Sequence, residues 1–210
     1  MQFTKDRRNF WAELNQARAG GKPKVWKQAF PEATNINFHT LLEANQYQAA
    51  ITNDDKILKG TAHLPGVEMD PRVKPYHIEF MENYERVDTE TLFNASFFFS
   101  LSDGHHSVHI HRDYESVLLI QGYGDVTFIT ANEDNSQKEV HTLKTGDAIF
   151  IPRLYGHKSV PMGPRVTLSL GANPSKAMTT NNFMSQPANT SQPYNSVSYT
   201  HLTLPTILLV

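Results

Sequence analysis

Side chains that can bind a metal recur at alternate positions in one short segment. Every second position from residue 109 to residue 115 carries an imidazole or a carboxylate, namely His109, His111, Asp113 and Glu115. If this segment is a β-strand, alternate side chains share one face, so all four would point the same way. Such a row is costly to bury without partners. Because imidazole and carboxylate groups bind iron, manganese, zinc and nickel, the row predicts a metal site.

One more candidate ligand lies further along the chain. Residues 146–157 read GDAIFIPRLYGH, an apolar run followed by Pro152 and then His157. The apolar run predicts a buried strand. A histidine at its far end, placed beside His111, would complete a facial set of ligands and leave coordination positions open. His111 and His157 therefore belong to every metal hypothesis for this chain.

These two segments resemble the two motifs of the cupin superfamily. The first motif, H-x-H-x3-E-x6-G, ends at Gly122, and the second, G-x5-P-x4-H, runs from Gly146 to His157. The glycine that usually stands two residues after the proline is absent, and Leu154 takes its place. The resemblance implies a mainly β fold, the double-stranded β-helix or jelly-roll barrel. It also implies a metal with four ligands, which would be His109, His111, Glu115 and His157.

The same segment is also similar to the JmjC-type branch of 2-oxoglutarate-dependent oxygenases. That branch carries H-x-D followed by an apolar run that ends in glutamine, here His111, Asp113 and the run VLLIQ to Gln121. This resemblance implies an Fe(II) site formed by His111, Asp113 and His157. Strand alternation does not choose between Asp113 and Glu115, so both ligand sets stay open.

The oxygenase interpretation also needs a cation for the second carboxylate of 2-oxoglutarate. The family's basic residue has no counterpart, because Val126 stands at its place counted from His111. Arg165 is the candidate replacement, and Thr167 and Ser169 are expected to contact the same cofactor. A solvated strand end is the alternative interpretation of Arg165.

Three functions follow from these interpretations. The first is Fe(II)- and 2-oxoglutarate-dependent hydroxylation of a protein side chain or a small molecule. The second is a small metal cupin, a dioxygenase or an isomerase, that works without 2-oxoglutarate. The third is a non-catalytic cupin that binds a small ligand or another protein. A homodimer is compatible with each of them.

Composition limits the other classes of function. The chain has 210 residues, a formal net charge of -2 and no cysteine. The charge indicates no basic face for nucleic acid and no polybasic membrane signal. The lack of cysteine excludes disulfides, thiolate zinc sites and cysteine nucleophiles, and it suits a cytoplasmic protein. No apolar run approaches the about 20 residues of a membrane helix, and no signal peptide is visible.

Helical periodicity is confined to the first part of the chain. It predicts a helix over 4–18 and a second over 38–48, the latter capped by Asn37 and burying Leu42 and Tyr47 together with Leu41. We therefore expect residues 1–75 to form a helical and loop region packed on the barrel.

Short apolar runs separated by turn residues dominate the next part of the chain. They predict the antiparallel barrel over 76–173. Residues 174–210 are rich in Asn, Ser, Thr, Gln and Pro, which predicts a disordered tail without a packed core contact. The last stretch, 197–210, resembles the translated end of a sequencing adaptor, so no site residue is sought there.

Overall fold

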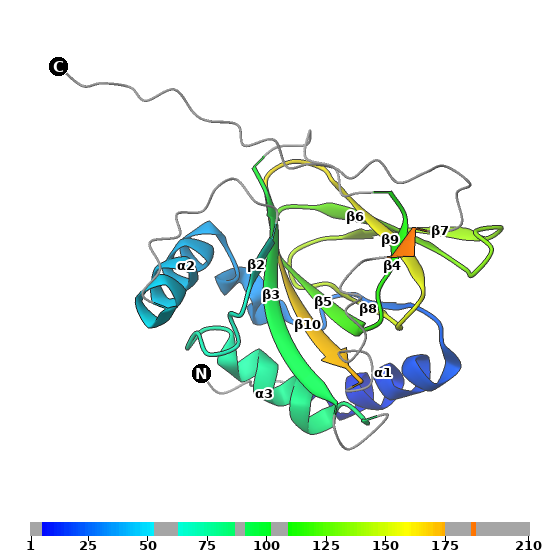
Figure 1. The fold of residues 1–210 in the computed structure, drawn as a ribbon, viewed down its shortest axis with the longest axis horizontal. Coiled ribbons are helices and arrows are strands. Elements are labelled where there is room, and N and C mark those ends of the chain that lie inside the picture. Colours follow the sequence, from blue (N-terminus) through cyan, green and yellow to red (C-terminus); the bar gives the residue numbers. More distant parts are fainter. Residues whose placement is uncertain (1–5, 53–62, 87–90, 102–108, 175–185, 188–210) are drawn as a thin grey trace.

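Two antiparallel sheets make up the body of the molecule (Figure 1). The computed structural model describes residues 6–52, 63–86, 91–101, 109–174 and 186–187. The six-stranded sheet has the order β1-β8-β5-β10-β3-β2, and the five-stranded sheet has the order β11-β4-β9-β6-β7. The strands of the six-stranded sheet are β1 (Lys24–Trp26), β2 (His63–Pro65), β3 (Leu92–Ser100), β5 (Ser116–Tyr123), β8 (Ala148–Ile151) and β10 (Arg165–Asn173). Those of the other sheet are β4 (His111–Arg112), β6 (Val126–Ala131), β7 (Lys138–Leu143), β9 (Gly156–Pro161) and β11 (Gln186–Pro187).

Helices cover the outer face of the six-stranded sheet, and Figure 1 shows α1 and α3 on the side away from β6 and β9. Buried residues of the helices and of alternate β10 positions form one apolar cluster, which includes Leu14, Phe80, Val166, Leu168 and Leu170. No helix in the described ranges has both the length and the apolar character needed to cross a membrane. The helical elements are α1 (Arg8–Gly20), the 3-10 helix η1 (Pro31–Asn35), α2 (Phe38–Thr52) and α3 (Lys74–Asn83).

A second apolar cluster lies between the sheets. It joins residues of β5 and β8 to residues of β6, among them Val117, Leu119, Ile149 and Phe128. Because Val166, Leu168 and Leu170 of β10 face the helices, the alternate residues Arg165, Thr167 and Ser169 face the second sheet. The predicted architecture, a mainly β jelly roll with helices at the N-terminal end, is confirmed.

The predicted buried face of α2 is wrong in part. The helix starts where predicted, because Asn37 Oδ1 accepts a hydrogen bond from the Thr40 backbone N–H at 3.1 Å. Leu42 and Tyr47, however, are 53% and 40% exposed. The buried side chains in this part of the helix include Leu41 and Ala44, three residues apart. A helix turns by about 100° per residue, and Leu42 points away from the face that buries Leu41.

The structure also bears on the two segments that flank the expected barrel. Residue 75, the expected end of the N-terminal region, lies inside α3, and that region supplies β1 and β2 to the six-stranded sheet. In the tail, Gln186–Pro187 pairs with β4 through the backbone. Without them β4 would be the edge of its sheet, where unpaired backbone groups accept another strand. Residues 175–185 and 188–210 lie outside the described ranges.

Candidate metal centre

Two neighbouring strands bring His111 and His157 together. His111 on β4 is directly paired with His157 on β9. Side chains of such a pair share one face of the sheet and lie close together. The two imidazole ring centroids are 4.4 Å apart. The two histidines that every metal hypothesis requires are therefore neighbours, although 45 residues separate them in the chain.

Asp113 lies against both imidazoles. Its Oδ2 atom is 3.3 Å from His157 Nε2 and 3.7 Å from His111 Nε2. One ligand atom from each of the three residues lies within 4.8 Å of the others. Two imidazole nitrogens and one carboxylate oxygen in this arrangement can hold a divalent transition metal and leave coordination positions open.

Hydrogen bonds orient both rings toward Asp113. His111 Nδ1 lies 3.2 Å from the carbonyl oxygen of His109, and His157 Nδ1 lies 3.1 Å from that of Tyr155. A carbonyl oxygen only accepts, so each Nδ1 donates and each Nε2 keeps its lone pair for a ligand contact. Metal-binding histidines usually donate their other ring nitrogen in this way. The residues present therefore fit a resident metal ion.

Electrostatics favour the forms of these groups that bind a metal. Burial is the main cause that lowers the pKa of His111, and the neighbouring His157 adds to it. Burial alone would raise the pKa of Asp113, but the close approach of His157 and the neighbouring His111 outweigh burial and lower that pKa. At neutral pH the first group is thus a neutral imidazole and the second an ionised carboxylate, as metal coordination requires.

Glu115 and His109 stand apart from this cluster. Glu115 Oε2 accepts hydrogen bonds from Asn94 Nδ2 at 3.0 Å and Asn173 Nδ2 at 2.8 Å. Burial is the main cause that raises the pKa of Glu115. The His109 side chain is exposed. The expectation that all four side chains share one face is wrong for His109, because β4 covers only His111–Arg112 and strand alternation does not extend back to residue 109.

Arg165 is buried among hydroxyl groups. Its side chain faces the second sheet and the residue is 4% exposed, so its interpretation as a solvated strand end is wrong. Nη1 donates to Thr167 Oγ1 at 2.7 Å, and Nη2 donates to Ser159 Oγ at 3.1 Å. Thr167 Oγ1 donates in turn to Gln121 Oε1 at 2.6 Å. Arg165 Nε is buried and has no hydrogen-bond partner among the described residues.

The buried guanidinium has no counter-ion within the described part of the chain. Burial lowers the pKa of Arg165 to about 10, so the group stays charged at neutral pH. An uncompensated buried charge is costly, and an anion would relieve that cost. Ser159, which accepts from Arg165, lies two residues from His157 on the same face of β9, about 7 Å along the strand. Ser169 is buried on the same face of β10 as Arg165.

Leu154 occupies the turn between β8 and β9 in the left-handed backbone conformation, with a φ of 61°. Its backbone N–H donates to the Asp113 carbonyl oxygen at 2.7 Å, which connects the turn to the metal cluster. We predict that Leu154→Gly is more stable than Leu154→Ala by about 1 kcal/mol, because only glycine adopts this conformation without strain. Both variants remove the same side chain beyond Cβ, so urea denaturation of the pair isolates the strain. Equal stability would contradict a strained turn.

Comparisons with known proteins show the fold. No protein-family model and no curated protein matches the chain. The structure of E. coli ycfD aligns over 93% of this chain and 64% of that one, with a TM-score of 0.52 and 15% identity. A structure of YcfD described as a ribosomal oxygenase in complex with cobalt and succinic acid aligns over 49% and 33%, with a TM-score of 0.35 and 18% identity.

A cupin 2 domain-containing protein from Halorhodospira halophila aligns over 39% of this chain and 53% of that one, with a TM-score of 0.33 and 15% identity. The chain thus spans less than two thirds of the length of each of these structures. The similarity to ycfD agrees with the cupin-type double-stranded β-helix that the two sheets form.

Proposed function

We propose that the protein is an Fe(II)- and 2-oxoglutarate-dependent oxygenase that hydroxylates a protein side chain or a small molecule. The observation that carries the proposal is the buried, unpaired charge of Arg165 on the same inner surface as the cluster of His111, Asp113 and His157. Three ligands for one metal ion, taken alone, suit many cupin functions. A cluster with a buried cation nearby suits a co-substrate that has a chelating end and a second carboxylate.

Each residue has a distinct role in this proposal. His111, Asp113 and His157 would hold the iron, and the hydrogen bonds of the two imidazoles keep Nε2 directed at it. Iron, 2-oxoglutarate and dioxygen together convert a C–H bond to an alcohol, while 2-oxoglutarate becomes succinate and carbon dioxide.

The second carboxylate of 2-oxoglutarate would pair with the Arg165 guanidinium. The hydroxyl groups of Thr167 and Ser159 hold that guanidinium in place. Ser169, which is buried on the same face of β10, would contact another part of the bound 2-oxoglutarate. Apolar side chains between the sheets, such as Leu119 and Phe128, exclude water from this space.

The alternative with four ligands requires a rearrangement. Glu115 would have to leave Asn94 and Asn173 to reach the metal. The description of YcfD, with which this chain shares its fold, as a ribosomal oxygenase supports the proposal of an oxygenase.

Anaerobic spectroscopy tests the proposal. We expect one Fe(II) per chain and a visible charge-transfer band when 2-oxoglutarate is added, followed by succinate release when oxygen is admitted. Succinate, which lacks the 2-oxo group, is the matched control ligand and should give no band. Bound iron without the band would favour the metal cupin that works without 2-oxoglutarate. A chain that binds no metal would favour the non-catalytic alternative.

A further inference from the structure

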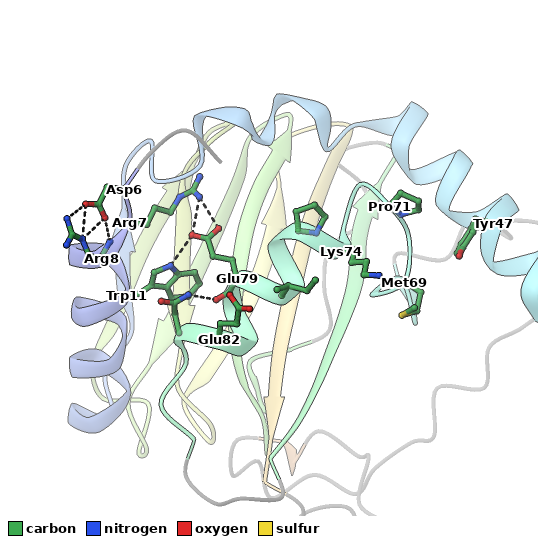
Figure 2. Close-up of a pocket in the computed structure, with 13 residues that line it drawn as sticks. Asp6, Arg7, Arg8, Trp11, Tyr47, Met69, Pro71, Lys74, Glu79 and Glu82 are labelled. Atoms are coloured by element: carbon green, nitrogen blue, oxygen red, sulfur yellow. Dashed lines mark hydrogen bonds and ion pairs between the residues drawn. The ribbon is translucent and has the colours of Figure 1, made fainter. Parts of the chain in front are cut away.

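An open groove of about 900 Å³ lies on the helical face of the molecule (Figure 2). Its lining includes residues of α3, of the start of α1 and of the segment around residues 69–71. Three large apolar side chains lie exposed along it: Tyr47 at 40%, Met69 at 56% and Ile78 at 41%. Contact with another protein would remove the apolar surface of these three side chains from water.

The exposed side of α3 carries a basic, an apolar and an acidic residue in a row. Lys74, Ile78 and Glu82 are four residues apart and all are exposed, so they lie in one row along the helix. Figure 2 shows Lys74 and Glu82 toward opposite ends of α3. The row therefore has a positive end, an apolar centre and a negative end.

Both charges are at the wrong end for their own helix. The helix macrodipole favours acidic side chains in the first turn and basic ones in the last. The first turn of α3 has no acidic residue and its last turn no basic one; Lys74 and Glu82 stand there instead. Neither side chain forms an ion pair or a hydrogen bond with another residue in the described ranges. A helix running in the opposite direction would compensate both charges.

We propose that α3 packs antiparallel against α3 of a second copy of the chain, around a two-fold axis at Ile78. A two-fold operation turns the row onto itself, so Lys74 of each copy meets the partner's Glu82. Each charge then also lies near the favourable end of the partner's helix dipole. Tyr47 and Met69 add apolar contacts beside Ile78. This inference is independent of the proposed oxygenase activity.

Charge reversal tests the geometry of the pair. Lys74→Glu and Glu82→Lys should each weaken dimerisation by about tenfold, because each change places two like-charged pairs in the symmetric interface. The double variant should dimerise like the wild type, and an equimolar mixture of the two single variants should form a heterodimer. Sedimentation velocity across a concentration series measures all of these. Lys138→Glu, an exposed site on β7, is the control with the same change in net charge.

Crosslinking tests the position of the axis. The chain has no cysteine, so Ile78→Cys introduces a single thiol that should form a disulfide-linked dimer on oxidation. Val140→Cys, on β7 and 67% exposed in the wild type, should not. A wild type that stays monomeric across the series would overturn the proposal. A dimer that Lys74→Glu does not weaken would also overturn it. The same holds for a double variant that dimerises less than the wild type, because in the proposed interface the two reversed charges attract each other again.

Discussion

Asp113→Ala is expected to abolish Fe(II) binding, whereas Glu115→Ala is expected to retain it. Asp113 Oδ2 lies within 3.7 Å of both imidazole Nε2 atoms, so its loss removes the only carboxylate of the cluster. Glu115 instead accepts hydrogen bonds from Asn94 and Asn173. Glu115→Ala should lower the affinity for iron by at most about 10–100-fold, the effect of losing a group that supports the ligands from outside the coordination sphere. Anaerobic iron titration of the two variants, side by side, measures the difference.

Two further variants serve as controls for this experiment. His111→Ala and His157→Ala should lose iron as completely as Asp113→Ala, because each removes one of three ligands. Circular dichroism of the apoproteins checks that each variant is folded. If Asp113→Ala binds iron like the wild type and Glu115→Ala does not, the cluster is assigned to the wrong carboxylate and the oxygenase proposal falls with it.

Arg165→Met is expected to separate cofactor binding from stability. Removing one partner of a buried charge pair costs about 2–5 kcal/mol, so affinity for 2-oxoglutarate should fall by about thirtyfold or more. Iron affinity should be unchanged, because Arg165 makes its hydrogen bonds to Thr167 and Ser159 and none to the three ligands. The apoprotein should become more stable, by about 1 kcal/mol or more, since an unpaired buried charge is replaced by an apolar side chain of similar length.

The measurement needs both readouts on the same protein. Anaerobic titration of the iron-loaded variant with 2-oxoglutarate gives the affinity, and thermal unfolding of the apoprotein gives the stability. Arg153→Met, at the exposed β8–β9 turn, is a matched control that should change neither. Undiminished 2-oxoglutarate affinity in Arg165→Met would mean that another group holds the second carboxylate.

The sequence was sufficient for the parts of the site that depend on local spacing. His111 was recognisable because it shortly precedes the apolar strand β5, and His157 because it shortly follows the apolar strand β8. The pairing of β4 with β9 then places the two histidines side by side. The choice between Asp113 and Glu115 was not accessible in this way. It depends on where β4 ends, and the chain leaves regular strand geometry after Arg112.

Contacts between distant segments could not be predicted from local sequence patterns either. Asn94 and Asn173 bind Glu115 because β3 and β10 pair in a register that sets Asn94 opposite Gly171. A side chain at Gly171 would collide with Glu115, whose Oε2 lies 2.5 Å from the Cβ position. No motif marks these residues. The exposed face of α2 was mispredicted for a related reason, since neighbouring leucines offer two possible faces and only packing selects one.

The position of β10 in the middle of its sheet constrains how this protein can change through evolution. β10 is bonded to β3 on one side and β5 on the other, and its two faces serve different purposes. Insertion or deletion of a single residue would exchange those faces, turning Arg165 toward the helices and Val166 toward the second sheet. Substitutions can therefore accumulate along this strand, but changes in its length cannot. Relatives with altered substrates should differ in loop length around the barrel and keep the length of β10.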